Sequence, residues 1–92
     1  MKRNNFSGYY WCDASQGIPA QAIKAGVDKD GGDIYVGRAT HNGEIQPAKV
    51  LPNQGCAYVA WGGEEHRKDD YEVCGLDLFI LTSSYQPIFL VQ

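Results

Sequence analysis

Two charged side chains, Asp28 and Lys49, flank a segment of short apolar runs separated by turn residues. A carboxylate accepts hydrogen bonds and an ammonium group donates them, while each hydroxyl group of a sugar ring can do both. On a rigid frame the two side chains can therefore hold a hydroxylated ring. The alternative is an exposed ion pair between them, which contributes about 0–1 kcal/mol to stability, and the residue types alone favour it.

Arg38, Glu65 and Trp61 are further candidates for a binding site. Arg38 can line a pocket or pair with a neighbouring acid, and we expect the pair. Glu65 follows two glycines at 62–63, which let a ligand approach the backbone closely. Trp61 offers a flat apolar surface for stacking of a sugar ring. Strand alternation puts it on the same side as Val59, however, so we expect Trp61 in the core.

The serines and carboxylates show no pattern typical of catalysis. Ser15, Ser83 and Ser84 lack the local signature of a nucleophile with a histidine base. Glu64 and Glu65 are adjacent, so their side chains point apart and do not suit the paired carboxylates of a glycosidase. We therefore expect no enzymatic activity and no catalytic residues.

Residues 28–33, DKDGGD, resemble part of a calcium-binding loop. The twelfth position counted from Asp28 is Ala39, where an EF-hand loop needs a glutamate. Asp side chains that bond to backbone N–H groups of a turn explain the segment better, and a looser, water-rich calcium site is the alternative. His41 and His66 have no further histidine or cysteine at ligand spacing. We expect no metal site and no cofactor.

Size and charge restrict the class of protein. The 92 residues suffice for one small domain, 1–92, with little area for a deep cleft. A net charge of −3 without a basic stripe argues against nucleic acid as a partner. No apolar run reaches the roughly 20 residues that span a bilayer, or the length of a signal peptide. We expect a cytoplasmic protein that does not insert into membranes, with secretion by another route as the alternative.

Three cysteines, Cys12, Cys56 and Cys74, are an odd number and lack the spacing of a disulfide framework or a zinc site. Buried free thiols are the expected state, because unpaired cysteine behaves as a small apolar residue. A reducing compartment agrees with this expectation.

Turn residues divide the chain into short runs, with Asp30-Gly31-Gly32, Asn42-Gly43 and Gly62-Gly63 as the clearest tight turns. Candidate strands lie at 9–14, 22–27, 33–39, 45–51, 56–61, 71–73, 76–82 and 87–91. Residues 64–70 carry charges of both signs and are interpreted as a solvated loop. Short strands with regular turn signals predict an all-β fold, a small antiparallel β-sandwich or barrel.

The most apolar runs, at 76–81 and 88–91, surround a polar turn at 82–86. A hairpin with two buried arms is one interpretation. Contact with a second chain is the other, because an exposed apolar edge strand pairs readily.

Residues 11–73 contain the run WCDASQGIPAQAIKAGVDKDGGDIYVGRATHNGEIQPAKVLP, followed by CAYVAWGGEEH and YEV. Together these motifs resemble the DM9 repeat, a family of invertebrate immune and stress proteins that also accompanies natterin-like toxins. Family members commonly carry two interleaved repeats, whereas one is visible here, followed by a hydrophobic tail at 75–92. The resemblance thus implies either pairing of two chains or a tail that supplies the missing strands.

The resemblance implies an all-β DM9 fold and, as in several members, a lectin that recognises mannose-type glycans in innate immunity. Lectin members carry an acid and a lysine at positions matching Asp28 and Lys49, which favours these two as ligand-binding residues. Glu65 and Arg38 are the further candidates from their chemistry. The expected partners are mannose-containing glycans and a second copy of the chain, as a homodimer. The alternative is a non-catalytic interaction or assembly domain, or a toxin-associated DM9 module.

Overall fold

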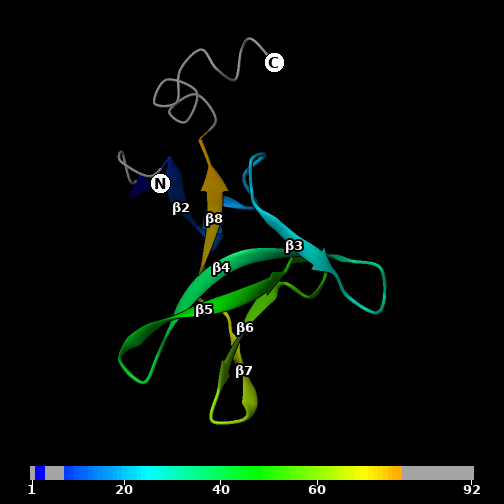
Figure 1. The fold of residues 1–92 in the computed structure, drawn as a ribbon, viewed down its shortest axis with the longest axis vertical. Coiled ribbons are helices and arrows are strands. Elements are labelled where there is room, and N and C mark those ends of the chain that lie inside the picture. The colour runs from blue at the N-terminus through cyan, green and yellow to red at the C-terminus, as the bar shows by residue number, and fades with distance from the viewer. Residues whose placement is uncertain (1, 4–7, 78–92) are drawn as a thin grey trace, which may run out of the picture.

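The computed structural model describes residues 2–3 and 8–77 (Figure 1). Its strands are β1 (Lys2–Arg3), β2 (Tyr9–Asp13), β3 (Lys24–Val27), β4 (Asp33–His41), β5 (Glu44–Leu51), β6 (Cys56–Trp61), β7 (Glu64–Lys68) and β8 (Glu72–Leu76). Two short 3-10 turns are η1 (Ala14–Gln16) and η2 (Pro52–Gln54). These strands form one antiparallel sheet in the order β1-β2-β8-β4-β5-β6-β7, with β3 attached to β4. The predicted antiparallel all-β fold is confirmed.

The sheet is strongly twisted. In Figure 1, β4 and β5 run across the view, β2 and β8 rise above them, and β6 and β7 descend below. The right-handed twist of paired strands accumulates into such a change of direction. As a result β4 approaches β7, although β5 and β6 lie between them in the sheet: the ring centroids of His41 and His66 are 4.4 Å apart.

Strand β4 holds two strands in succession along one edge. β3 pairs with its first residues, and β8 pairs with Gly37 and Arg38. Ile23 lies at the junction, where its N–H donates to the carbonyl of Cys74 (3.1 Å) and its carbonyl accepts from the N–H of Val36 (2.9 Å). These bonds fix the position of β3 and of the turn that follows it.

Two hairpins close through the predicted glycine turns. Asn42 and Gly43 connect β4 to β5 with φ of 53° and 79°. Gly62 and Gly63 connect β6 to β7 with φ of 62° and 80°. Two-residue hairpin turns of type I′ need positive φ at both central residues, a conformation that glycine and asparagine adopt at low cost.

The charged segment at 64–68 is a strand, β7, and not part of a solvated loop as its composition predicts. It pairs with β6 from Trp61 opposite Glu64 to Ala57 opposite Lys68. β7 is the last strand on its side of the described sheet. Charged side chains suit such an edge because they discourage pairing with other chains. The glycine turn at 62–63 therefore indicates this strand better than the hydrophobicity of its residues does.

The core consists of small side chains on one face of the sheet. The buried cluster and its neighbours are Ala39, Ala48, Val50, Ala57, Val59 and Val73, with Ile18, Ala22, Tyr35 and Tyr71 packed against them. This packing requires a residue without a side chain at position 37, which is a glycine. A Cβ there would meet the side chain of Val50 and lie 2.5 Å from the carbonyl oxygen of Glu72. All three cysteines are buried free thiols, as predicted.

The predicted strand at 71–73 and the start of the predicted strand at 76–82 belong to a single strand, β8. It runs through Gly75, where the ring of Tyr10 occupies the space that a side chain would fill. The predicted hairpin or chain contact at 76–91 lies outside the described residues, except for Leu76 and Asp77.

Candidate functional site

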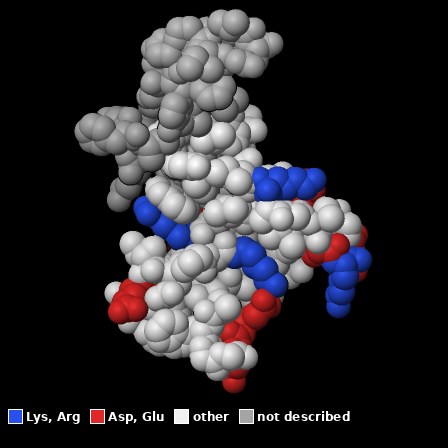
Figure 2. All heavy atoms as spheres, in the orientation of Figure 1, with Lys and Arg blue, Asp and Glu red and all other residues white. Residues whose placement is uncertain are grey.

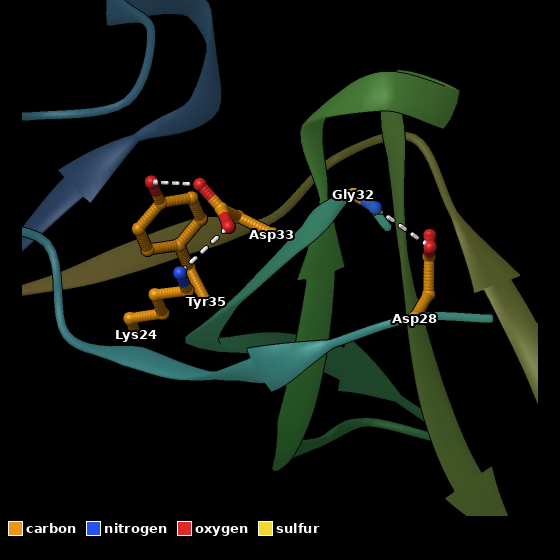
Figure 3. Close-up of polar contacts among 5 residues, drawn as sticks. All are labelled: Lys24, Asp28, Gly32, Asp33 and Tyr35. Carbon is orange, nitrogen blue, oxygen red and sulfur yellow. Dashed lines mark hydrogen bonds and ion pairs between the residues drawn. The ribbon is translucent and has the colours of Figure 1, made fainter. Parts of the chain in front are cut away.

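The turn that connects β3 to β4 is held by the carboxylate of Asp28. Its Oδ1 accepts from the backbone N–H groups of Asp30 and Gly32, each at 2.9 Å, and Figure 3 shows the second of these bonds. The backbone closes the same turn, with the N–H of Asp28 donating to the carbonyl of Gly32 at 2.8 Å. Among the described residues these carboxylate bonds use Oδ1 only, so Oδ2 keeps its capacity to accept a hydrogen bond from a ligand.

The base of this turn is fixed by a second cluster, also shown in Figure 3. The ammonium group of Lys24 lies 2.9 Å from Asp33 Oδ1, and the hydroxyl of Tyr35 donates to Asp33 Oδ2 at 3.4 Å. The hydrogen bond from Lys24 lowers the pKa of Asp33, and the same bond raises the pKa of Lys24. Both groups stay charged near neutral pH, which ties β3 to β4.

Strands β5, β6 and β7 place a second charged group opposite the turn. Lys49 of β5 is the register partner of Tyr58, and Ala60 of β6 is the partner of Glu65 on β7. Directly paired residues share one face, so all four lie on the same face of the sheet. Lys49 Nζ forms an ion pair of 2.7 Å with Glu65 Oε2, and their side chains are 43% and 54% exposed.

The turn and the three strands enclose an open cavity of about 490 Å³, which we call the Asp28 cavity. Its lining residues are Asp28, Lys29, Asp30, Ile34, Lys49, Leu51, Gln54, Tyr58 and Glu65. The volume lies within the range of about 300–1,000 Å³ found for small-molecule sites. The structure thus brings together three of the four residues predicted from sequence, and Lys49 pairs with Glu65 rather than with Asp28.

Arg38 lies apart from this cavity. Its Nε is 2.7 Å from Glu72 Oε1, and its guanidinium group stacks on the ring of Trp11, 4.1 Å from the centroid. It lines a separate depression of about 210 Å³ with Asp13 and Asp70 among others. The expected pairing of Arg38 with an acid is confirmed, and the geometry does not join it to Asp28, Lys49 and Glu65.

Tyr58 is a cavity residue that the sequence interpretation did not select. Its hydroxyl donates to Gln54 Oε1 at 3.4 Å. Interaction with the Cys56 side chain, through a hydrogen bond and then through charge, raises the pKa of Tyr58, so the phenol remains a neutral donor. Strand alternation together with the register of β5 and β6 would have identified Tyr58, because it faces the same side as Lys49.

Trp61 is not a core residue, contrary to the sequence prediction. Its side chain is 40% exposed at the end of β6, where it contacts His41 with ring centroids 5.7 Å apart. Trp61 does lie on the same face as Val59, but Val59 belongs to the buried cluster and Trp61, two residues further along β6, does not. Desolvation, with smaller effects of Lys68 and His66, lowers the pKa of His41.

Within residues 2–3 and 8–77, no group of three or more His, Cys, Asp or Glu side chains is arranged to hold a metal ion. The same stretch of the chain has no helix long and apolar enough to cross a bilayer.

A comparison with protein-family models matches residues 28–79 to the DM9 repeat, and the match begins at the aspartate that holds the turn. It covers more than half of the chain and every residue that lines the Asp28 cavity. No curated protein matches the sequence.

Proposed function

Because the chain belongs to the DM9 repeat family, we propose that it is a carbohydrate-binding module that recognises mannose-type glycans in innate immune recognition. The observation that carries this proposal is the Asp28 cavity, which is lined both by an acid from the β3–β4 turn and by a lysine from β5. We place the sugar in this cavity.

The polar groups of the cavity suit a neutral ligand rich in hydroxyl groups. Asp28 Oδ2 accepts, Lys49 Nζ donates, and Glu65 both orients the lysine and offers further acceptor oxygens. Figure 2 shows acidic and basic side chains side by side, without a broad patch of one sign on the described portion of that face. Such a surface favours an uncharged ligand over a polyanion.

We propose binding without chemical conversion of the ligand. Asp28 already holds the turn with one oxygen, and the charge of Glu65 is compensated by Lys49, so neither is placed as a free general acid. For one sugar ring in an open site we expect millimolar to micromolar affinity, roughly −4 to −8 kcal/mol.

The test compares two lysines that lie on opposite faces of the sheet. Isothermal titration with methyl α-mannoside should show binding by the wild type and a loss of at least roughly tenfold in Lys49→Met, because a charge-assisted hydrogen bond contributes about 1.5–3 kcal/mol. Lys68→Met removes a lysine of β7 that does not line the cavity, and it should bind as the wild type does. A glycan array without signal for the folded wild type, or equal binding by both variants, contradicts the proposal.

A further inference from the structure

A second depression adjoins the Asp28 cavity on the same face of the sheet. It measures about 340 Å³, and we call it the apolar groove. Its lining residues are Ala25, Tyr35, Val36, Gly37, Pro47, Ala48, Lys49, Tyr58, Ala60 and Glu65. Three of them, Lys49, Tyr58 and Glu65, also line the Asp28 cavity, so the two depressions meet at the Lys49–Glu65 ion pair.

The groove differs from the cavity in chemistry. Val36 is the register partner of Lys49, and Pro47 is the partner of Arg38, so both lie on the face that carries the ion pair. Ala60 continues this row on β6, and Ala25 adds a methyl group from β3. Away from the shared ion pair and the two tyrosines, the lining residues are therefore apolar, whereas the Asp28 cavity carries several charged side chains.

The groove is exposed and shallow because its side chains are small. Ala25, Pro47 and Ala60 are each exposed, and none reaches far above the backbone. The side chains of Pro47 and Ala60 leave a flat apolar surface against which a flat apolar group can pack. Such a group gains affinity in proportion to the apolar area that is removed from water.

The shared residues determine which ligand can use both depressions. The two depressions meet at Lys49 and Glu65, so a sugar whose hydroxyl groups contact these residues from the Asp28 cavity can place a further substituent over the apolar groove. We propose that the site takes a glycoside with an apolar substituent on its anomeric oxygen, an aryl or alkyl aglycone, which lies on Pro47 and Ala60. This inference rests on the proposed sugar binding in the Asp28 cavity.

Titration with a matched pair of ligands tests the inference. Phenyl α-mannoside should bind the wild-type chain roughly 5- to 30-fold more tightly than methyl α-mannoside, the gain expected for partial burial of one ring. A mannose disaccharide, whose second unit is polar, should gain less than the phenyl glycoside. Ala60→Gln and Ala25→Gln each place a polar side chain over the groove and should reduce the phenyl gain to about threefold or less, with binding of the methyl glycoside unchanged.

The control is Ala20→Gln, which alters an exposed alanine of the loop before β3 and should keep the full gain. Equal affinity of the two glycosides, or a larger gain for the disaccharide, overturns the inference and leaves sugar binding in the cavity intact. A phenyl gain that survives both groove variants overturns it as well. If neither glycoside binds, the proposed function fails together with the inference.

Discussion

At the scale of single residues, Asp28 combines two tasks that sequence alone does not separate. One carboxylate oxygen satisfies two backbone N–H groups of the turn, and the residue also lines the cavity. The first task is the expected one for an aspartate before glycines, since short acids hold turns in this way. The second depends on the neighbours that the fold supplies. Substitutions can separate the two, because asparagine keeps an acceptor oxygen and loses the charge.

For Asp28→Ala we expect a loss of about 0.5–2 kcal/mol in the free energy of unfolding, the size found when a side chain that caps backbone N–H groups is removed. Asp28→Asn should retain most of this stability, because its amide oxygen can still accept from Gly32 and Asp30. Both variants should bind methyl α-mannoside less tightly. Urea denaturation and titration measure the two effects separately, and an Asn variant with unchanged affinity would argue against contact between Asp28 and the ligand.

The candidate residues show what sequence can identify. The residue types and the family resemblance selected Asp28, Lys49 and Glu65, which the fold places around one cavity. Arg38 was selected for its chemistry, but its strand position turns it toward Trp11 and Glu72. Tyr58 needs the register between β5 and β6, a non-local property that no single segment encodes.

At the scale of elements, the turns were predictable and one strand was not. Asn-Gly and Gly-Gly favour tight hairpin turns, so both hairpins could be predicted from these dipeptides. β7 carries no apolar pattern, because neither of its faces is covered enough to require one. The strand forms by backbone pairing with β6, and this pairing does not require apolar side chains.

The junction of β4 and β8 provides a test at this scale. Gly37→Ala should cost about 1–3 kcal/mol, because the added methyl group collides with Val50 and with the carbonyl of Glu72. Gly26→Ala on β3 is the matched control, since no atom lies within 4 Å of the position that its Cβ would take. That variant should be neutral or slightly more stable. Urea denaturation decides the matter, and similar stability of the two variants would refute close packing of β8 on β4.

At the scale of the whole molecule, the twist joins regions of the sheet that are not neighbours in it. His41 of β4 lies beside His66 of β7 and Trp61 of β6. The His66 ring also contacts the carbonyl of Trp61, with Nε2 at 3.1 Å. The sequence alone does not indicate this cluster, because its members belong to two hairpins and lie together only in the folded sheet.

The cluster predicts a dependence of stability on pH. The pKa of His41 is lowered by desolvation and by Lys68 and His66, so the unfolded chain binds a proton more readily than the folded one. The contribution of His41 to the free energy of unfolding is therefore complete above its ordinary pKa of about 6.5 and is lost as the pH falls below that value. The paired carboxylate of Asp33, whose pKa is also lowered, loses its contribution only at much lower pH.

Thermal melting between pH 7.5 and about 5 should thus show a falling melting temperature in the wild type and a flatter profile in His41→Gln. Because the side chain of His41 is only partly buried, we expect the melting temperature to change only slightly with pH. A wild-type profile that rises toward pH 5, or one that is identical in the variant, would rule out the cluster as its cause.

The Asp28 cavity draws its whole lining from residues 28–65, which form consecutive antiparallel neighbours along one stretch of chain. Because that stretch lies inside the segment that matches the repeat, a duplicated copy would bring its own complete cavity rather than half of a shared one. Valency in such a protein would grow with the number of copies. Weak individual sites, held at a fixed spacing, would then retain a glycan-coated surface far longer than any one of them could.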